Sequence, residues 1–190
     1  ARHDLLAGRP LLCQMARGMT QITYHPAFDP YHQIFRTVRL LIAVGEPFDG
    51  DKLRIADFYL LFPEKISDIR LSRELRSAAG RLQAQSRFPY DRLPDSRVIF
   101  ARMEHTFQAA TQTMLHYGLL DASAAARQNM LALGPALNEG SPLFTRALAA
   151  NAEEAPLTEF LGNLIRSFPY LGANGLKDRT GLEEYRYDAA

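Results

Sequence analysis

The sequence has one cysteine, no tryptophan and no apolar run long enough to cross a membrane. Because a single thiol, Cys13, is unable to form a disulfide within the chain, we expect a reducing, cytoplasmic environment. A membrane-spanning helix needs about 20 consecutive apolar residues, so we also expect no contact with a membrane. The sequence thus indicates neither a disulfide scaffold nor a membrane protein.

The short motifs that mark common enzyme sites are also missing. The chain contains no G-x-x-x-x-G-K-[S/T], G-x-G-x-x-G, G-x-S-x-G or H-E-x-x-H sequence. A thiol nucleophile at Cys13 is disfavoured because Cys13 lies where the structural signals are weakest. His25 and His32 have no third ligand nearby, which disfavours a metal site. We therefore expect no catalytic residue, no cofactor and no metal ion.

Charge is nearly balanced over the whole chain but unevenly distributed along it. The 22 basic and 21 acidic residues give a net charge of +1, which argues against a dedicated non-specific nucleic-acid binder. Arginines are nevertheless concentrated between residues 70 and 92. Arg70, Arg73 and Arg76 recur at three-residue spacing and would line one face of a helix. Such a row would lie along a phosphate backbone or against a partner protein; an ordinary solvated helix face is the alternative.

The most apolar and aromatic stretch runs from Leu53 to Ile69. Asp51 stands where an N-cap belongs and Pro63 predicts the end of the helix. A helix with so narrow a polar face is expected to be buried on nearly all sides.

Asp57 is an acid in the middle of this stretch, and a buried carboxylate is costly unless it is paired. Arg54, one turn earlier, is the simplest partner, and Arg36 and Arg39 of the preceding helix are alternatives. An interface contact and a catalytic role are further possibilities for Asp57. We expect a structural ion pair between Arg54 and Asp57.

Capping residues and apolar periodicity predict a mainly α-helical chain. Helices are expected to start at Pro30, after Ser72, after Asp95, at Pro142 and near Pro156. The order of elements around residues 119–133, a helix followed by Gly-Leu-Leu and a short apolar segment, is typical of the end of a winged helix-turn-helix. The predicted fold is therefore a helical domain with a winged-helix-like unit and a short β-hairpin.

We expect residues 1–18 to be an N-terminal extension outside the fold and residues 19–190 to form a single domain. The C-terminal residues 169–188 are rich in Gly, Tyr, Arg and Glu. Few of them would form a core alone, so they are expected to fold back onto the body.

Two motifs carry a resemblance to a known family. They are Asp57–Pro63, DFYLLFP, and Gly175–Asp188, GLKDRTGLEEYRYD, with RME at 102–104 and YGLL at 117–120 between them. From about Phe28 to Asp188, the sequence resembles a middle component of the prokaryotic ABC three-component systems, the Lamassu-type antiphage defence cassettes.

The resemblance implies a non-enzymatic accessory subunit of a bacterial antiviral defence complex. Such a subunit would bridge an SMC-like ABC ATPase and an effector such as a nuclease, and DNA contact within the complex is possible. The residues that we expect at partner or DNA contacts are Arg70, Arg73, Arg76, Lys177, Arg179, Tyr185 and Arg186. The alternative function is a winged-helix DNA-binding transcriptional regulator.

Overall fold

The structure, a computed structural model, describes residues 25–85, 95–127 and 129–183. This part is mainly helical, as predicted, and contains one short antiparallel pair of strands. The helices are η2 (Pro26–Phe28), α1 (Pro30–Val44), α2 (Gly50–Leu61), η3 (Pro63–Asp68), α3 (Arg73–Gln85), α4 (Ser96–His116), α5 (Ala122–Ala125), α6 (Pro142–Glu153), α7 (Ala155–Ser167) and α8 (Leu176–Thr180). The strands are β1 (Phe48–Asp49) and β2 (Met130–Leu131). The predicted extension, residues 1–18, lies outside the described residues.

α1 begins and ends where its sequence predicts. The Asp29 carboxylate accepts hydrogen bonds from the backbone N–H groups of Tyr31 and His32 at 2.8 and 3.0 Å, which satisfies donors that the first helical turn leaves free. Gly45 follows the helix with a φ of 76° and donates its N–H to the Leu41 carbonyl. Glycine adopts this left-handed conformation without the steric cost that a Cβ brings.

α2 is buried along most of its length, as predicted for the apolar stretch. All residues from Leu53 to Leu60 are buried. The N-cap is Asp49 rather than Asp51, because its carboxylate accepts the N–H groups of Asp51 and Lys52. α2 thus starts earlier than the predicted cap allows, immediately after β1.

α4 is one continuous helix of 21 residues. Gly118 follows it with a φ of 67°, and the Leu119 N–H donates to the Met114 carbonyl at 2.8 Å. The Gly118 N–H donates to the Leu115 carbonyl at 3.2 Å. These two bonds form the Schellman motif that the Gly-Leu pair predicts.

The strands come from distant parts of the sequence. Phe48 pairs with Leu131 and Asp49 with Met130. Leu120 and Leu133 form an isolated antiparallel bridge, so the segment 119–133 doubles back on itself. The alanines within it form α5 instead of a strand, which agrees with the high helix propensity of alanine. The winged-helix arrangement stays a prediction.

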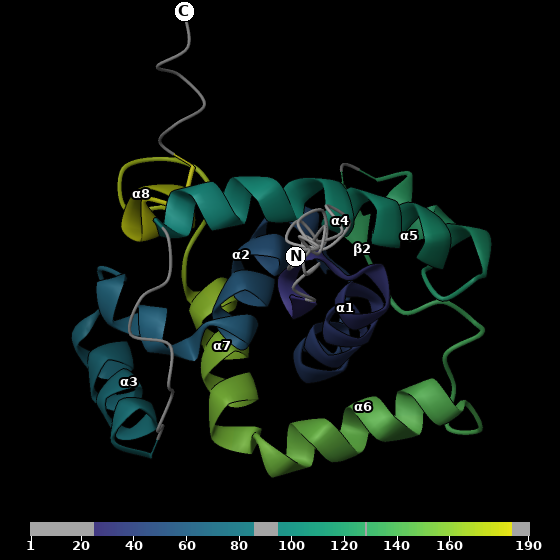
Figure 1. Ribbon diagram of the computed structural model, residues 1–190, viewed down its shortest axis with the longest axis horizontal. Coiled ribbons are helices and arrows are strands. Elements are labelled where there is room, and N and C mark those ends of the chain that lie inside the picture. Colours follow the sequence, from purple (N-terminus) through teal and green to yellow (C-terminus); the bar gives the residue numbers. More distant parts are fainter. Residues whose placement is uncertain (1–24, 86–94, 128, 184–190) are drawn as a thin grey trace, which may run out of the picture.

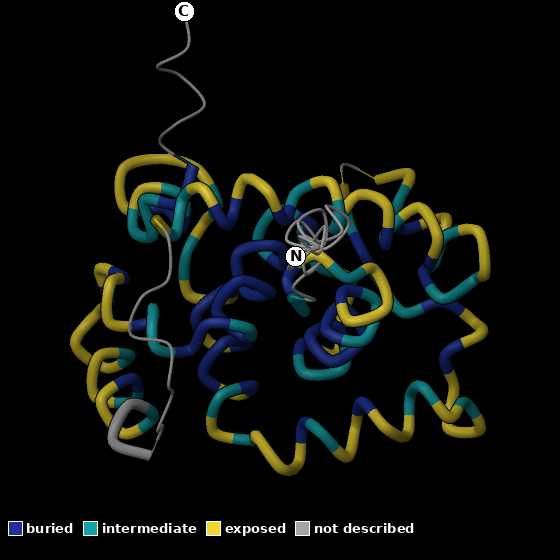
Figure 2. The backbone as a smooth tube through the Cα atoms, in the orientation of Figure 1, coloured by how far each residue is buried: buried dark blue, intermediate teal, exposed yellow. Residues whose placement is uncertain are grey.

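The helices surround α1 and α2 (Figure 1). α4 crosses one side of the molecule and α6 the opposite side, with α1 between them, while α3, α7 and α8 lie beyond α2. Buried residues concentrate on α1, α2 and α7 (Figure 2). Val38, Leu53, Phe58, Leu161 and Ile165 are among the core residues. None of the described helices has the combination of length and apolarity that spanning a bilayer requires.

Candidate functional site

The three predicted contact arginines lie at or just before the start of α3. Arg73 is the first residue of α3, Arg76 follows one turn later, and Arg70 lies in the segment between η3 and α3. All three are exposed. The expected row along a single helix face is thus incomplete, since Arg70 is outside the helix. The Ser72 hydroxyl accepts the N–H of Leu75, which fixes where α3 begins.

The predicted C-terminal contact residues Lys177 and Arg179 lie on α8. α8 is anchored to the body because Leu176 is buried in the core, so the tail folds back as expected as far as residue 183. Gly175 lies so close to the carbonyl of Tyr170 that a Cβ there would meet it at 2.7 Å. Tyr185 and Arg186 lie outside the described residues.

The segment that leads into α3 lies beside α8. The Arg70 guanidinium contacts the Asp178 carboxylate at 2.8 Å, and the Arg70 N–H donates to the Arg179 carbonyl at 3.1 Å. Arg179 in return donates a guanidinium N–H to the Arg70 carbonyl. The hydrogen bond from Arg70 holds the pKa of Asp178 below its usual value. We call the surface formed by Arg70, Arg73, Arg76, Lys177 and Arg179 the basic edge.

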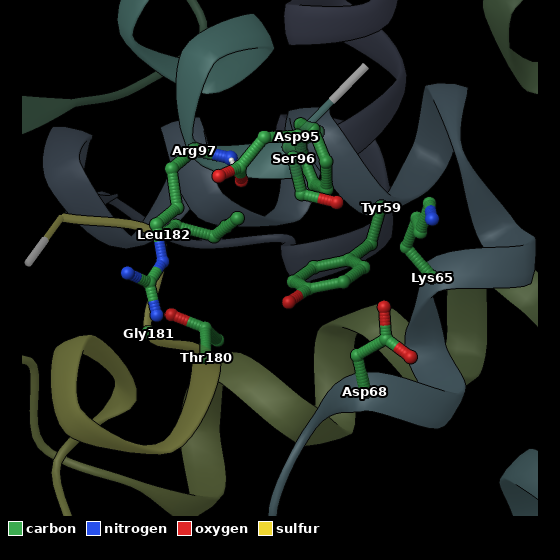
Figure 3. Close-up of a pocket in the computed structure, with 10 residues that line it drawn as sticks. Tyr59, Lys65, Asp68, Asp95, Ser96, Arg97, Thr180, Gly181 and Leu182 are labelled. Carbon is green, nitrogen blue, oxygen red and sulfur yellow. Dashed lines mark hydrogen bonds between the residues drawn. The ribbon is translucent and has the colours of Figure 1, made fainter. Parts of the chain in front are cut away.

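A cavity of about 270 Å³ lies between α2, η3, the start of α4 and the end of α8 (Figure 3). The ring of Tyr59 lies across it, between Asp68 and Thr180. Burial, and to a lesser extent the charge of Asp68, raises the pKa of Tyr59 strongly. The phenol therefore stays protonated, which excludes a phenolate nucleophile at neutral pH.

Asp57 is held by Arg36, not by Arg54. The Asp57 carboxylate accepts hydrogen bonds from Nε and a terminal nitrogen of Arg36 at 2.6 and 3.3 Å. Arg36 also donates to the Pro26 carbonyl and to Gln33. The expected Arg54–Asp57 pair is thus replaced by one of the alternatives, because the α1 guanidinium reaches the carboxylate with two nitrogens.

Arg54 instead joins α2 to the C-terminal segment. Its guanidinium lies 3.5 Å from the buried Glu183 carboxylate and 3.6 Å from Glu104, and it stacks 4.0 Å from the centroid of the Phe100 ring. The Tyr170 hydroxyl donates to Glu183 at 2.7 Å. Burial, followed by this hydrogen bond, raises the pKa of Tyr170.

A third buried arginine, Arg39, joins α1 to α6. It donates to the Asn151 side chain at 2.9 Å and to the Glu154 carboxylate at 2.6 Å. This contact was not predicted from the sequence. An arginine among the apolar residues of a helix nevertheless indicates that a buried guanidinium needs a polar partner. Within the described ranges, no three His, Cys, Asp or Glu side chains are grouped to hold a metal ion.

The described residues form a mainly helical domain in which five of the predicted contact residues lie on two segments distant in sequence, residues 70–76 and α8, that meet through Arg70. The chain belongs to the family described as ABC-three component (ABC-3C) system Middle Component 5, whose model matches residues 22–188. No curated protein and no solved structure shows a significant match to the chain.

Proposed function

We propose that this chain is a non-enzymatic accessory subunit that bridges an SMC-like ABC ATPase and an effector, such as a nuclease, in a Lamassu-type bacterial antiviral defence complex. Membership of the ABC-3C middle-component family is the observation that carries this proposal. The single cysteine supports a cytoplasmic location for the complex.

The basic edge is the contact surface that we assign to one of these partners. Arg70, Arg73 and Arg76 are exposed, and their neighbours Asp178 and Arg179 fix the position of Arg70. Arginine is enriched at protein interfaces because its planar guanidinium donates several hydrogen bonds at once. The surface would suit an acidic partner patch, and the charge would speed the encounter.

Co-purification of the components from a tagged operon tests the bridging role. The wild-type chain is expected to elute with both the ATPase and the effector; elution of the chain alone, with both present, contradicts the proposal. The Arg73→Glu/Arg76→Glu double variant is expected to lose one partner. Arg102→Glu is the matched control, because Arg102 is exposed on α4 and belongs neither to the basic edge nor to the lining of the hollows along α1.

A winged-helix DNA-binding regulator is the second candidate, and the exposed arginines of the basic edge favour it. Arg70 already contacts Asp178 at 2.8 Å, however, so less positive charge remains for phosphate contacts. Duplex binding would fall steeply with salt because each phosphate contact releases counterions. The absence of a gel shift at about 50 mM salt would exclude this candidate.

A further inference from the structure

Two hollows along α1 are lined in part by the same three elements. One, of about 760 Å³, lies toward the start of α1, where Tyr31 and Phe35 line it together with Leu119 and Leu143. The other, of about 470 Å³, lies toward the end of α1, where Ile42 lines it together with Leu133 and Phe144. In both, α1, α6 and the segment 119–133 contribute to the walls; Pro26, Leu60 and Leu61 also line the first hollow, and Pro47 also lines the second. We call the two hollows together the α1 groove.

The α1 groove has an apolar wall that the described residues leave partly open. Tyr31, Phe35 and Ile42 share one face of α1, since residues separated by four and eleven positions lie on the same side of a helix. Tyr31 is 83% exposed. Large aromatic side chains such as this one are typical anchors of protein interfaces. From Tyr31 to Gly45 the wall is about 21 Å long, the length of a helix of about 14 residues.

The charges along the α1 groove change sign from one end to the other. Arg146 lines the hollow at the start of α1 and is exposed, whereas Glu154, the one acid in that lining, is paired with the buried Arg39. Glu46 and Asp121 line the hollow at the end of α1, where the described lining includes no lysine or arginine; Arg166, outside that lining, lies 3.8 Å from Glu46. Hydrogen bonds from Ser123 lower the pKa of Asp121, so this carboxylate stays ionised at neutral pH.

We propose that the α1 groove binds an amphipathic helix of a partner protein, with an aliphatic stripe against α1, carboxylates beside Arg146 and lysines or arginines beside Glu46 and Asp121. Helix-in-groove recognition uses apolar anchors at i, i+3, i+4 and i+7. Acids in the first turn and bases in the last turn are the arrangement that the helix dipole favours. The bound helix would then run in the same direction as α1.

A pair of synthetic peptides of about 14 residues tests this binding mode with the full chain. Both carry leucines at i, i+3, i+4 and i+7; one has glutamates in the first turn and lysines in the last, and the other has them exchanged. The first peptide is expected to bind about tenfold more tightly, because reversal places like charges together. Equal binding of the two peptides, or no binding of the first, overturns the proposal.

Substitutions in the chain test whether the first peptide binds in the α1 groove. Arg146→Glu and Tyr31→Ala are each expected to weaken binding of the first peptide about tenfold. Their controls are Arg81→Glu, on α3, and Leu148→Ala, which is 50% exposed on α6 but lines neither hollow. Unchanged binding by both Arg146→Glu and Tyr31→Ala contradicts the assignment to the groove. Analytical ultracentrifugation tests for a second copy of the chain in the α1 groove. A wild-type dimer that the Arg146→Glu substitution dissociates would place a second copy in the groove and would also overturn the proposal.

That the partner is a subunit of the same defence complex rests on the proposed function, and the two are tested separately. If the wild-type chain co-purifies with its partners, the Tyr31→Ala/Arg146→Glu variant is expected to lose one of them. An intact complex from that variant overturns the groove assignment and leaves the bridging role standing. If the wild-type chain purifies alone, the bridging role fails, while the peptide pair still decides whether the groove binds a helix.

Discussion

Replacing Asp57 with alanine removes the acceptor that neutralises a buried guanidinium. Arg36 is only 5% exposed and Asp57 1%, so neither charge is well solvated. Of the hydrogen bonds that Arg36 donates, the two to Asp57 are lost and those to Pro26 and Gln33 remain. An uncompensated buried charge typically costs about 3–5 kcal/mol, and the surviving bonds place the expected loss near the low end, about 3 kcal/mol.

For a chain of this size, about 3 kcal/mol corresponds to a fall in Tm of about 6–12 °C. Differential scanning fluorimetry and urea titration measure the change, with Glu153→Ala as a control because Glu153 is exposed at the end of α6. The double variant Arg36→Met/Asp57→Ala is expected to be more stable than Asp57→Ala alone, since it removes the stranded charge. Assembly with the partners should weaken in parallel with stability. Loss of function by Asp57→Ala with unchanged melting and assembly would refute this reasoning.

Four further substitutions test particular positions. Gly134→Ala should destabilise the chain severely, because its Cβ would lie 2.3 Å from a backbone oxygen, whereas Gly80→Ala meets open space and should stabilise α3 by about 0.5–1 kcal/mol; similar melting of the two variants contradicts the expectation. Burial raises the pKa of Asp51 above 3.8, so the ionised form opposes folding. Asp51→Asn should therefore raise the Tm near neutral pH, and this gain should vanish below about pH 3.8, where the acid is protonated in both states. Tyr170→Phe removes the hydrogen bond to Glu183 and should cost about 1.5 kcal/mol, with faster hydrogen exchange in residues 170–183; unchanged exchange there argues against the contact.

Local signals in the sequence were sufficient to place most helices. Asp29, Ser141 and Asp95 accept hydrogen bonds from the backbone of the helices that follow them, and a capping interaction involves only residues within one turn. Asp49 and Asp51 are both suitable caps for α2 by residue type. In the structure Asp49 is the cap, at the end of β1, which pairs with β2. This pairing joins distant parts of the chain and is therefore absent from any local sequence pattern.

Long-range contacts limited the prediction of the candidate site. Arg54 and Asp57 are one turn apart, which favours a pair within the helix, yet each finds its partner elsewhere: Arg36 on α1 for Asp57, and Glu183 near the C-terminus for Arg54. The proximity of Arg70 to Asp178 is also invisible to local patterns. The α1 groove was not predicted, because its walls come from α1, α6 and the segment 119–133, which are distant in the sequence.

The three buried arginines of α1 and α2 share a structural role that bears on bridging. Arg36 joins α1 to α2, Arg39 joins α1 to α6, and Arg54 joins α2 to α4 and the C-terminal segment. Buried ion pairs add little net stability compared with apolar packing, but a partner displaced from its position leaves a charge unpaired. These ion pairs therefore connect helices α1 and α2 to both exposed surfaces. Arg39 holds α6, which forms a wall of the α1 groove, and Arg54 holds the C-terminal segment, which follows α8 of the basic edge. In the proposed bridging role, these ion pairs would keep the two exposed surfaces in a fixed relation to each other.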